Sequence, residues 1–318
     1  MLRAAFIGAG GRARSAHYPT VTTVADVRVE AVCELDAALM AQVVGQYDIP
    51  RTFGDYRQML DAIDLDLVYV IMGEELMARI AIDCMNAGKH VFIEKPAGAN
   101  PEESRALLLA AEENGVTCAV GYQRRFAAVS VESMRLVHEH GGPTLAVGEF
   151  HKCLLGRSKP PRTTMWQDVC HAVDLVRHMA GSEVAEVTAF QDARGTEWTN
   201  DYTSLMRFEN GTTGVVLAHR SSGGRTLKGE LHGLGVGCSF TIPDHLEVLE
   251  DDREPRTEHG ADLAGVPADD SRAYDGTLEM HRHVAASIRD GSTPINDIRD
   301  VVHTSDLVAR LEGDSAFE

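Results

Sequence analysis

The sequence predicts an α/β chain in two parts: a doubly wound parallel sheet over residues 1–122, then an α+β domain with an open, mostly antiparallel sheet over residues 123–318. Up to Tyr122, short apolar runs alternate with helical patterns, which is typical of successive βα units. Beyond Tyr122, strand-like runs follow one another with turns between them. An alternative left open by the sequence is that the C-terminal helix packs back on the first domain.

Each element of the first domain has its own signal. Strands are expected at residues 4–7, 27–33, 67–71, 90–93 and 117–121. Five helices are expected: one that follows the first loop and ends near residue 24, one that begins at residue 37, a short one that ends at residue 62, and two at residues 76–87 and 101–114. Gly88 and Gly115 fall where helices end, and Pro101 suits the first turn of a helix.

In the second domain, the runs predict strands at residues 145–150, 184–191, 202–208, 213–220, 226–234, 239–242 and 245–249, and helices at 129–140, 171–179, 278–289 and 299–311. Asn210-Gly211 predicts a hairpin turn. The acidic stretch 251–270, with its glycines and prolines, is expected to be a long loop.

A glycine-rich loop follows the first strand and reads G-x-G-x-x-A. In this pattern the first glycine makes the tight turn, the second lets the backbone approach a pyrophosphate, and the small last residue permits close packing of helix and strand. The loop therefore predicts a dinucleotide-binding Rossmann domain, with cofactor contacts from Gly8, Gly10, Gly11, Arg12 and Ala13.

An acidic residue ends the second predicted strand. Glu34 lies about 20 residues beyond the loop, where a carboxylate binds the ribose 2′-hydroxyl and repels a 2′-phosphate. The sequence thus favours NAD over NADP as the cofactor, although Arg12 could partly compensate. The alternative is that Glu34 and Asp36 only form an exposed turn.

The composition limits the classes of possible binding partner. The formal net charge of −18 argues against binding to nucleic acid or to an anionic membrane surface. Six cysteines without a C-x-x-C pair fit reduced thiols, and a chain that begins with a strand and has no transmembrane-length segment is expected in the cytoplasm. No metal site is expected, because the histidines of the two H-x-H pairs point apart on a helix.

A second motif, Glu94-Lys95-Pro96, directly follows the apolar run Val91-Phe92-Ile93. The chain has only five lysines, so a lysine at the end of a central strand is a candidate for chemistry. The alternative for Lys95 is a strand-end lysine that points to solvent.

Together these motifs resemble the glucose-fructose oxidoreductase, inositol dehydrogenase and MocA (Gfo/Idh/MocA) family over nearly the whole chain. The residues that carry the resemblance are Gly8-x-Gly10-x-x-Ala13, the run from Ala87 to Pro96, Gly121-Tyr122-Gln123-Arg124-Arg125-Phe126, and His171-x-x-Asp174. The resemblance implies a Rossmann domain followed by an open-faced sheet domain, and reversible hydride transfer between a nicotinamide and a secondary alcohol of a sugar, polyol or related compound.

The resemblance also implies roles for single residues. His171 would be the general base, because the unperturbed pKa of histidine lies near neutrality, and Lys95 would stabilise the developing alkoxide. Further cofactor contacts are expected from Glu94, Lys95 and Gln123, and substrate contacts from Lys95, Tyr122, Trp166, Asp168 and His171. Since members commonly pair through the open sheet, a homo-oligomer, a dimer or a tetramer, is expected.

The chain departs from the family pattern around the histidine. Members often carry a catalytic aspartate four residues before it, where this chain has Gln167, whereas Asp168 lies three before. Asp168 is a third catalytic candidate if it orients His171, but it could equally be a helix N-cap. Such departures keep open a second class of function, a cofactor-binding sensor without turnover; the identity of the sugar or polyol does not follow from the sequence.

Overall fold

The computed structural model describes residues 1–160 and 162–313, which divide by their contacts into two compact units. The first unit combines residues 1–122 with 277–302, and the second combines residues 123–276 with those from 303 on. The segment 277–302, which the predicted boundaries place in the second domain, therefore belongs to the first unit. Residues 314–318 of the predicted second domain lie outside the described part.

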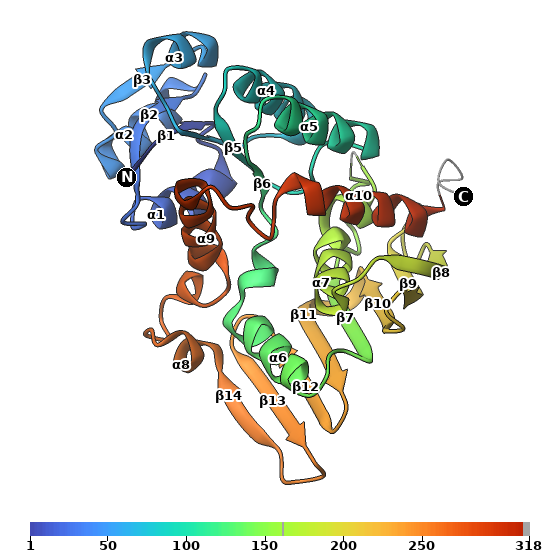
Figure 1. The fold of residues 1–318 in the computed structure, drawn as a ribbon. Coiled ribbons are helices and arrows are strands. Elements are labelled where there is room, and N and C mark those ends of the chain that lie inside the picture. The colour runs from blue at the N-terminus through green and yellow to red at the C-terminus, as the bar shows by residue number, and fades with distance from the viewer. Residues whose placement is uncertain (161, 314–318) are drawn as a thin grey trace. The chain divides into compact units, whose positions relative to one another are not determined.

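The first unit contains a six-stranded parallel sheet in the order β3-β2-β1-β4-β5-β6 (Figure 1). The strand order reverses between β1 and β4, so the doubly wound fold is confirmed. The strands are β1 (Leu2–Ile7), β2 (Val27–Cys33), β3 (Arg51–Phe53), β4 (Leu67–Val70), β5 (His90–Ile93) and β6 (Cys118–Val120).

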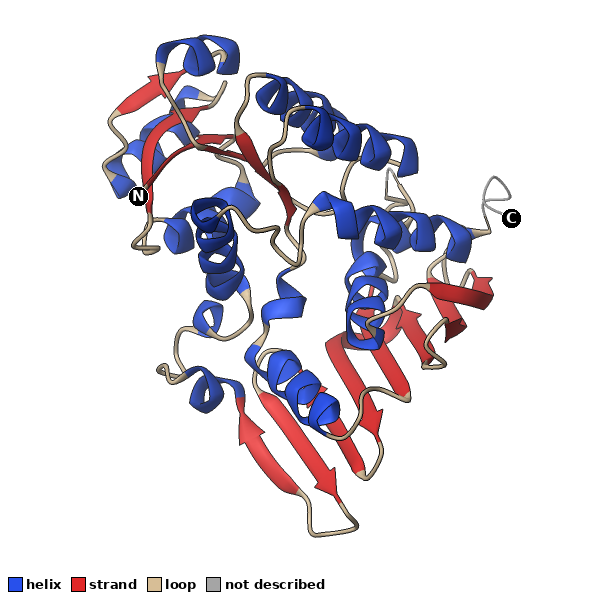
Figure 2. Ribbon diagram, viewed as in Figure 1, coloured by secondary structure: helices blue, strands red, loops and turns tan. Residues whose placement is uncertain are grey.

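Helices cover both faces of this sheet (Figure 2). They are the π-helical turn η1 (Ala13–His17) with α1 (Tyr18–Val21), α2 (Ala37–Tyr47), α3 (Tyr56–Ala62), α4 (Glu74–Asn86), α5 (Pro101–Glu113) and α9 (Thr277–Asp290). α4 packs beside α5, and α1 packs beside α9. Because both faces are covered, every residue of the central strand β4 is buried.

The second unit contains an eight-stranded sheet in the order β14-β13-β12-β11-β7-β10-β9-β8. β7 and β10 are parallel and the other neighbours are antiparallel, so the predicted open, mostly antiparallel sheet is confirmed. The strands are β7 (Leu145–Cys153), β8 (Val184–Asp192), β9 (Asp201–Phe208), β10 (Thr213–His219), β11 (Ser221–Gly233), β12 (Val236–Thr241), β13 (His245–Glu250) and β14 (Arg256–His259). The predicted hairpin turn at Asn210-Gly211 joins β9 to β10, with Gly211 at a φ of +87°.

Two helices, α6 (Ala128–Glu139) and α7 (Cys170–Ala180), pack on one face of this sheet (Figure 1). The strands alternate accordingly: in β9, Tyr202, Ser204 and Met206 are buried while Thr203 and Leu205 are not. The unit also contains the short helical turns η2 (Gln123–Phe126), η3 (Met165–Val169) and η4 (Ser271–Ala273), and the helices α8 (Gly260–Ala264) and α10 (Ile298–Glu312), whose first residues belong to the first unit.

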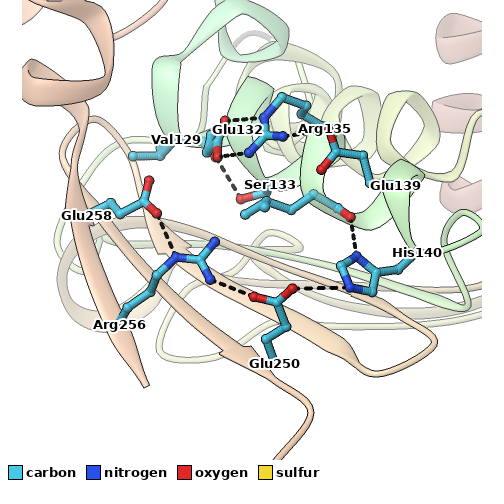
Figure 3. Close-up of polar contacts among 10 residues, drawn as sticks. Val129, Glu132, Ser133, Arg135, Glu139, His140, Glu250, Arg256 and Glu258 are labelled. Carbon is cyan, nitrogen blue, oxygen red and sulfur yellow. Dashed lines mark hydrogen bonds and ion pairs between the residues drawn. The ribbon is translucent and has the colours of Figure 1, made fainter. Parts of the chain in front are cut away.

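The stretch 251–270 corrects a prediction, because it is not one long loop. It holds the edge strand β14 and the helix α8. Arg256 of β14 forms ion pairs with Glu250 at 2.8 Å and with Glu258 at 2.9 Å, and His140 at the end of α6 also contacts Glu250 (Figure 3). The sequence did not predict β14, because its side chains are mostly charged and lack the alternation of apolar and polar residues that indicates a strand.

Among the described residues, no helix is both long and apolar enough to cross a membrane.

Candidate active site

The glycine loop turns at the carboxyl end of β1. Gly8 has a φ of +104°, and a Cβ atom there would lie 2.2 Å from the carbonyl oxygen of Ile71, so the fold itself requires glycine. A Cβ atom at Gly10 or Gly11 would meet no described heavy atom within 4 Å. These two glycines therefore leave open space above the backbone, as close approach of a ligand requires.

A cavity of about 530 Å³ lies beside this loop, at the carboxyl ends of β1, β2 and β4. Ligands of doubly wound sheets bind at this edge, where the strand order reverses. The residues that line the cavity are Ile7, Gly8, Gly10, Cys33, Glu34, Leu35, Gly54, Asp55, Tyr56, Arg57, Ile71, Met72, Gly73, Leu76, Arg79 and Ile80.

The carboxylate of Glu34 is fixed in this cavity. Its Oε2 accepts a hydrogen bond of 2.7 Å from the amide of Ala9 in the glycine loop, and its Oε1 accepts bonds from the amides of Leu35 and Asp36. Asp36 instead caps α2 through the amides of Ala38 and Leu39. The alternative that these acids only form an exposed turn therefore holds for Asp36. Glu34 instead connects β2 to the glycine loop and brings a negative charge to the cavity. With the open space at Gly10 and Gly11, these residues fit a dinucleotide.

Sequence reasoning missed two cations that line the same cavity, Arg57 and Arg79. The Arg57 guanidinium pairs with Asp83 at 2.8 Å and lies over the ring of Tyr56. The available signal was positional: Arg57 follows β3, the neighbour of β2, so it lies at the same edge of the parallel sheet.

Glu94, directly after β5, is held in a buried polar network. Its carboxylate accepts hydrogen bonds from Nε of Arg12 at 2.6 Å and from the amide of Lys95 at 3.0 Å, and it lies 2.8 Å from Nε2 of His17. Nδ1 of His17 in turn lies 3.1 Å from Nε2 of His281 on α9. Burial raises the pKa of Glu94, but the hydrogen bond and charge of His17, with Arg12 and Lys95, outweigh it and hold that pKa well below its usual value.

The predicted contacts of Arg12 and Glu94 with the cofactor remain predictions, since the structure pairs these two side chains with each other. Lys95 is half-buried. Tyr122, which ends the first unit, and Gln123, which begins the second, are both buried.

In the second unit, His171 is the second residue of α7, and its side chain is 8% exposed. Its Nδ1 atom is buried, and its ring lies 6.3 Å from that of Phe150. Trp166, in the preceding turn η3, is also buried.

Asp168 does not cap the helix, so the N-cap alternative is wrong: the N-cap position of α7 is Val169. The carboxylate of Asp168 pairs instead with Nζ of Lys152 at 2.8 Å and with Nη2 of Arg220 at 3.1 Å. Sequence reasoning missed both cations, because they come from β7 and from the residue after β10.

Nine of the predicted residues therefore fall into three groups. Gly8, Gly10 and Glu34 border one cavity; Arg12, Glu94 and Lys95 are joined by hydrogen bonds; and Trp166, Asp168 and His171 lie along one helical stretch.

Comparison with known proteins gives two family matches. Residues 2–122 match the model described as oxidoreductase family, NAD-binding Rossmann fold, and residues 156–235 match the Gfo/Idh/MocA C-terminal domain.

Related sequences include the 4-carboxy-2-hydroxymuconate-6-semialdehyde dehydrogenase of Sphingobium sp., 27% identical over 98% of both chains. The scyllo-inositol 2-dehydrogenase (NAD(+)) of Bacillus subtilis is 23% identical over 93% of this chain and 88% of that protein. An uncharacterized oxidoreductase of the same organism is 27% identical, with an alignment that spans 66% of this chain and 64% of that protein.

Solved structures share the fold. An oxidoreductase from Agrobacterium radiobacter in complex with NAD+, L-tartaric acid and magnesium superposes with a TM-score of 0.86 at 17% identity, covering 99% of this chain and 96% of the other. Levoglucosan dehydrogenase in complex with NADH and levoglucosan gives 0.84 at 20% identity, covering 99% and 97%. With its Rossmann domain and its open-sheet domain both matched, the chain belongs to the Gfo/Idh/MocA family of oxidoreductases.

Proposed function

We propose that the protein is an NAD-dependent oxidoreductase that transfers a hydride between the nicotinamide and a secondary alcohol or ketone of a sugar, a polyol or a related compound. The observation that carries the proposal is the Glu34 carboxylate, fixed in a cavity that the glycine loop also borders. A carboxylate in this position suits the free 2′-hydroxyl of NAD and disfavours the 2′-phosphate of NADP.

Proton transfer must accompany the hydride. In the direction of oxidation, His171 takes the proton of the substrate hydroxyl at Nε2, since its Nδ1 is buried. The ammonium group of Lys95 stabilises the negative charge that develops on the substrate oxygen. A dinucleotide held by the glycine loop and Glu34 would supply the nicotinamide as hydride acceptor.

The substrate class is supported by the relatives. Their names give scyllo-inositol, levoglucosan and a carboxylated muconate semialdehyde as substrates, so a ring or chain that carries hydroxyl or carbonyl groups is common to them.

We also propose that the chain self-associates through the open face of the second sheet. Leu205 is 55% exposed there, and its cross-strand neighbour Val215, itself paired with Val147, is half-exposed on the same face. Apolar side chains exposed side by side on a sheet face are typical of an interface.

The proposed activity is tested in two steps. Fluorescence titration with NADH and with NADPH measures cofactor binding, and absorbance of the reduced nicotinamide then reports turnover on a panel of sugars, inositols and their keto and acid forms. Turnover on one class supports the proposal. Tight NADH binding without turnover on any member would favour the sensor.

A further inference from the structure

Three cationic side chains surround one aromatic ring in the second unit. Nζ of Lys152 lies 4.9 Å from the centre of the Phe150 ring, and the guanidinium carbons of Arg220 and Arg225 lie 4.6 and 5.4 Å from it. The face of an aromatic ring attracts cations, so Phe150 helps to hold them in one small region. We call Lys152, Arg220 and Arg225 the basic cluster.

The basic cluster is not neutralised within the described part of the chain. Its ion pairs there involve one carboxylate, that of Asp168, which contacts both Lys152 and Arg220. Three positive charges against one negative leave an excess of two, in a chain with a formal net charge of −18. An excess of positive charge attracts an anion from solution.

Arg220 gives the strongest indication of a ligand. Its side chain is fully buried, and its Nη1 donates to the carbonyl oxygen of Phe150. Its Nε atom is buried without a hydrogen-bond partner among the described residues. Burying a charged donor in this state costs free energy that an anionic ligand would offset.

The basic cluster is accessible and adjacent to the proposed base. The side chains of Lys152 and Asp168 are 26% and 20% exposed, so one side is open to solvent. Phe150, at the centre of the cluster, has its ring 6.3 Å from that of His171. A group held by the cluster and a hydroxyl presented to His171 can therefore belong to one small molecule.

We propose that the basic cluster binds an anionic oxygen group of the substrate, a carboxylate or a phosphate. The substrate is then an acidic polyol, either a sugar acid or a sugar phosphate, rather than a neutral sugar. This inference rests on the proposed function only in taking the ligand to be the molecule that is oxidised. The shared chemistry is recognition of anionic oxygens by guanidinium and ammonium groups.

The test compares matched probes: glucose, gluconate, glucuronate and glucose 6-phosphate, and inositol beside inositol 1-phosphate. We expect an acidic probe to give the highest kcat/KM, with a KM that rises with ionic strength. Arg225→Ala and Lys152→Met should each raise that KM about tenfold or more, because each variant loses one charge-assisted hydrogen bond to the anion. The KM of neutral probes should rise much less, so the ratio of the two KM changes is the readout. The carboxylate and phosphate arms identify which anion is bound.

Arg253→Ala and Lys228→Met remove exposed cations of the same unit and serve as matched controls. If removal of the buried Arg220 prevents folding, Arg220→Lys, which retains the positive charge, takes its place. Neutral probes that turn over best, unaffected by Arg225→Ala and Lys152→Met, would overturn this inference while the proposed function stands. If no probe is turned over, calorimetry decides: binding of an acidic probe that both variants weaken would support the cluster and favour the sensor over the enzyme. No binding of any acidic probe would overturn the inference.

Discussion

The carboxylate of Glu94 lies 2.8 Å from Nε2 of His17, and both side chains are buried. This pair joins the end of β5 to the turn after the glycine loop, so it fixes the residue before Lys95 relative to the loop. The contact with His281 extends the network to α9.

Replacing His17 by phenylalanine should destabilise the protein by about 2 kcal/mol, because a buried carboxylate loses a hydrogen-bond partner. His17→Asn retains a donor and should recover part of the loss. Urea unfolding followed by circular dichroism measures the difference. Equal stability of His17→Phe and the wild type would show that the pair contributes nothing to folding.

Stability should fall as the pH falls below about 6.5, and more steeply below about 4.5. Burial holds the pKa of His281 well below its usual 6.5, and the His17 hydrogen bond and nearby charges outweigh burial and lower the pKa of Glu94 below its usual 4.5. In both cases the unfolded chain binds the proton more readily than the folded chain, so acid favours unfolding. Urea midpoints between about pH 4 and 8 measure the slope.

His281→Asn should flatten this slope between about pH 5 and 6.5, because the variant lacks a histidine that binds a proton there in the unfolded chain but not in the folded chain. The exposed His138→Asn is the matched control and should leave the slope unchanged. An unchanged slope in His281→Asn would assign the pH dependence to other groups.

Glu34→Ser should narrow the preference for NAD over NADP by about tenfold, because the carboxylate that repels a 2′-phosphate is removed. Asp36→Ser is the control, since it removes a nearby charge while keeping an N-cap residue. Dissociation constants for NADH and NADPH, measured by fluorescence titration of the wild type and both variants, test this prediction. A wild type that prefers NADP tenfold would indicate that Arg12, Arg57 or Arg79 outweighs Glu34.

Lys95→Ala and His171→Ala should each lower kcat by roughly 10²-fold or more, because each removes a group assigned to the reacting hydroxyl. Cofactor binding should change little. Steady-state kinetics and NADH titration on the same preparations separate the two effects, with His138→Ala as control. Near-normal turnover of His171→Ala would transfer the proton-transfer role to another group, such as Lys95 or Tyr122.

Leu205→Glu should convert the proposed oligomer to a monomer, since it places a charge on the apolar open face. Light scattering measures the mass. Leu109→Glu, at an equally exposed leucine of α5, is the matched control. A wild type that is already monomeric at micromolar concentration would refute association through this face.

Local patterns were sufficient for most of the fold. The range predicted for β2 is the range observed, because its apolar residues end abruptly at Glu34. The prediction of a loop at residues 251–270 was wrong because β14 is a short edge strand. Its stability comes from pairing with β13 and from ion pairs rather than from alternating apolar residues.

The site was only partly predictable for a different reason. Gly8 and Glu34 belong to one motif with a known spacing, so sequence alone places them at one edge of the sheet. His17 and His281 are 264 positions apart, and Asp168 pairs with one cation from β7 and with another from the residue that follows β10. No local pattern records such pairings, which exist only after the chain has folded.

The charged strand β14 bears on how the protein behaves when it is concentrated. One side of an edge strand presents unpaired backbone groups that invite another chain to add a strand, the first step of many aggregation reactions. Here Arg256 sits on that edge with Glu250 and Glu258 as partners, and a chain that stacked against it would have to desolvate these charges. The polar edge thereby protects an open sheet from uncontrolled extension.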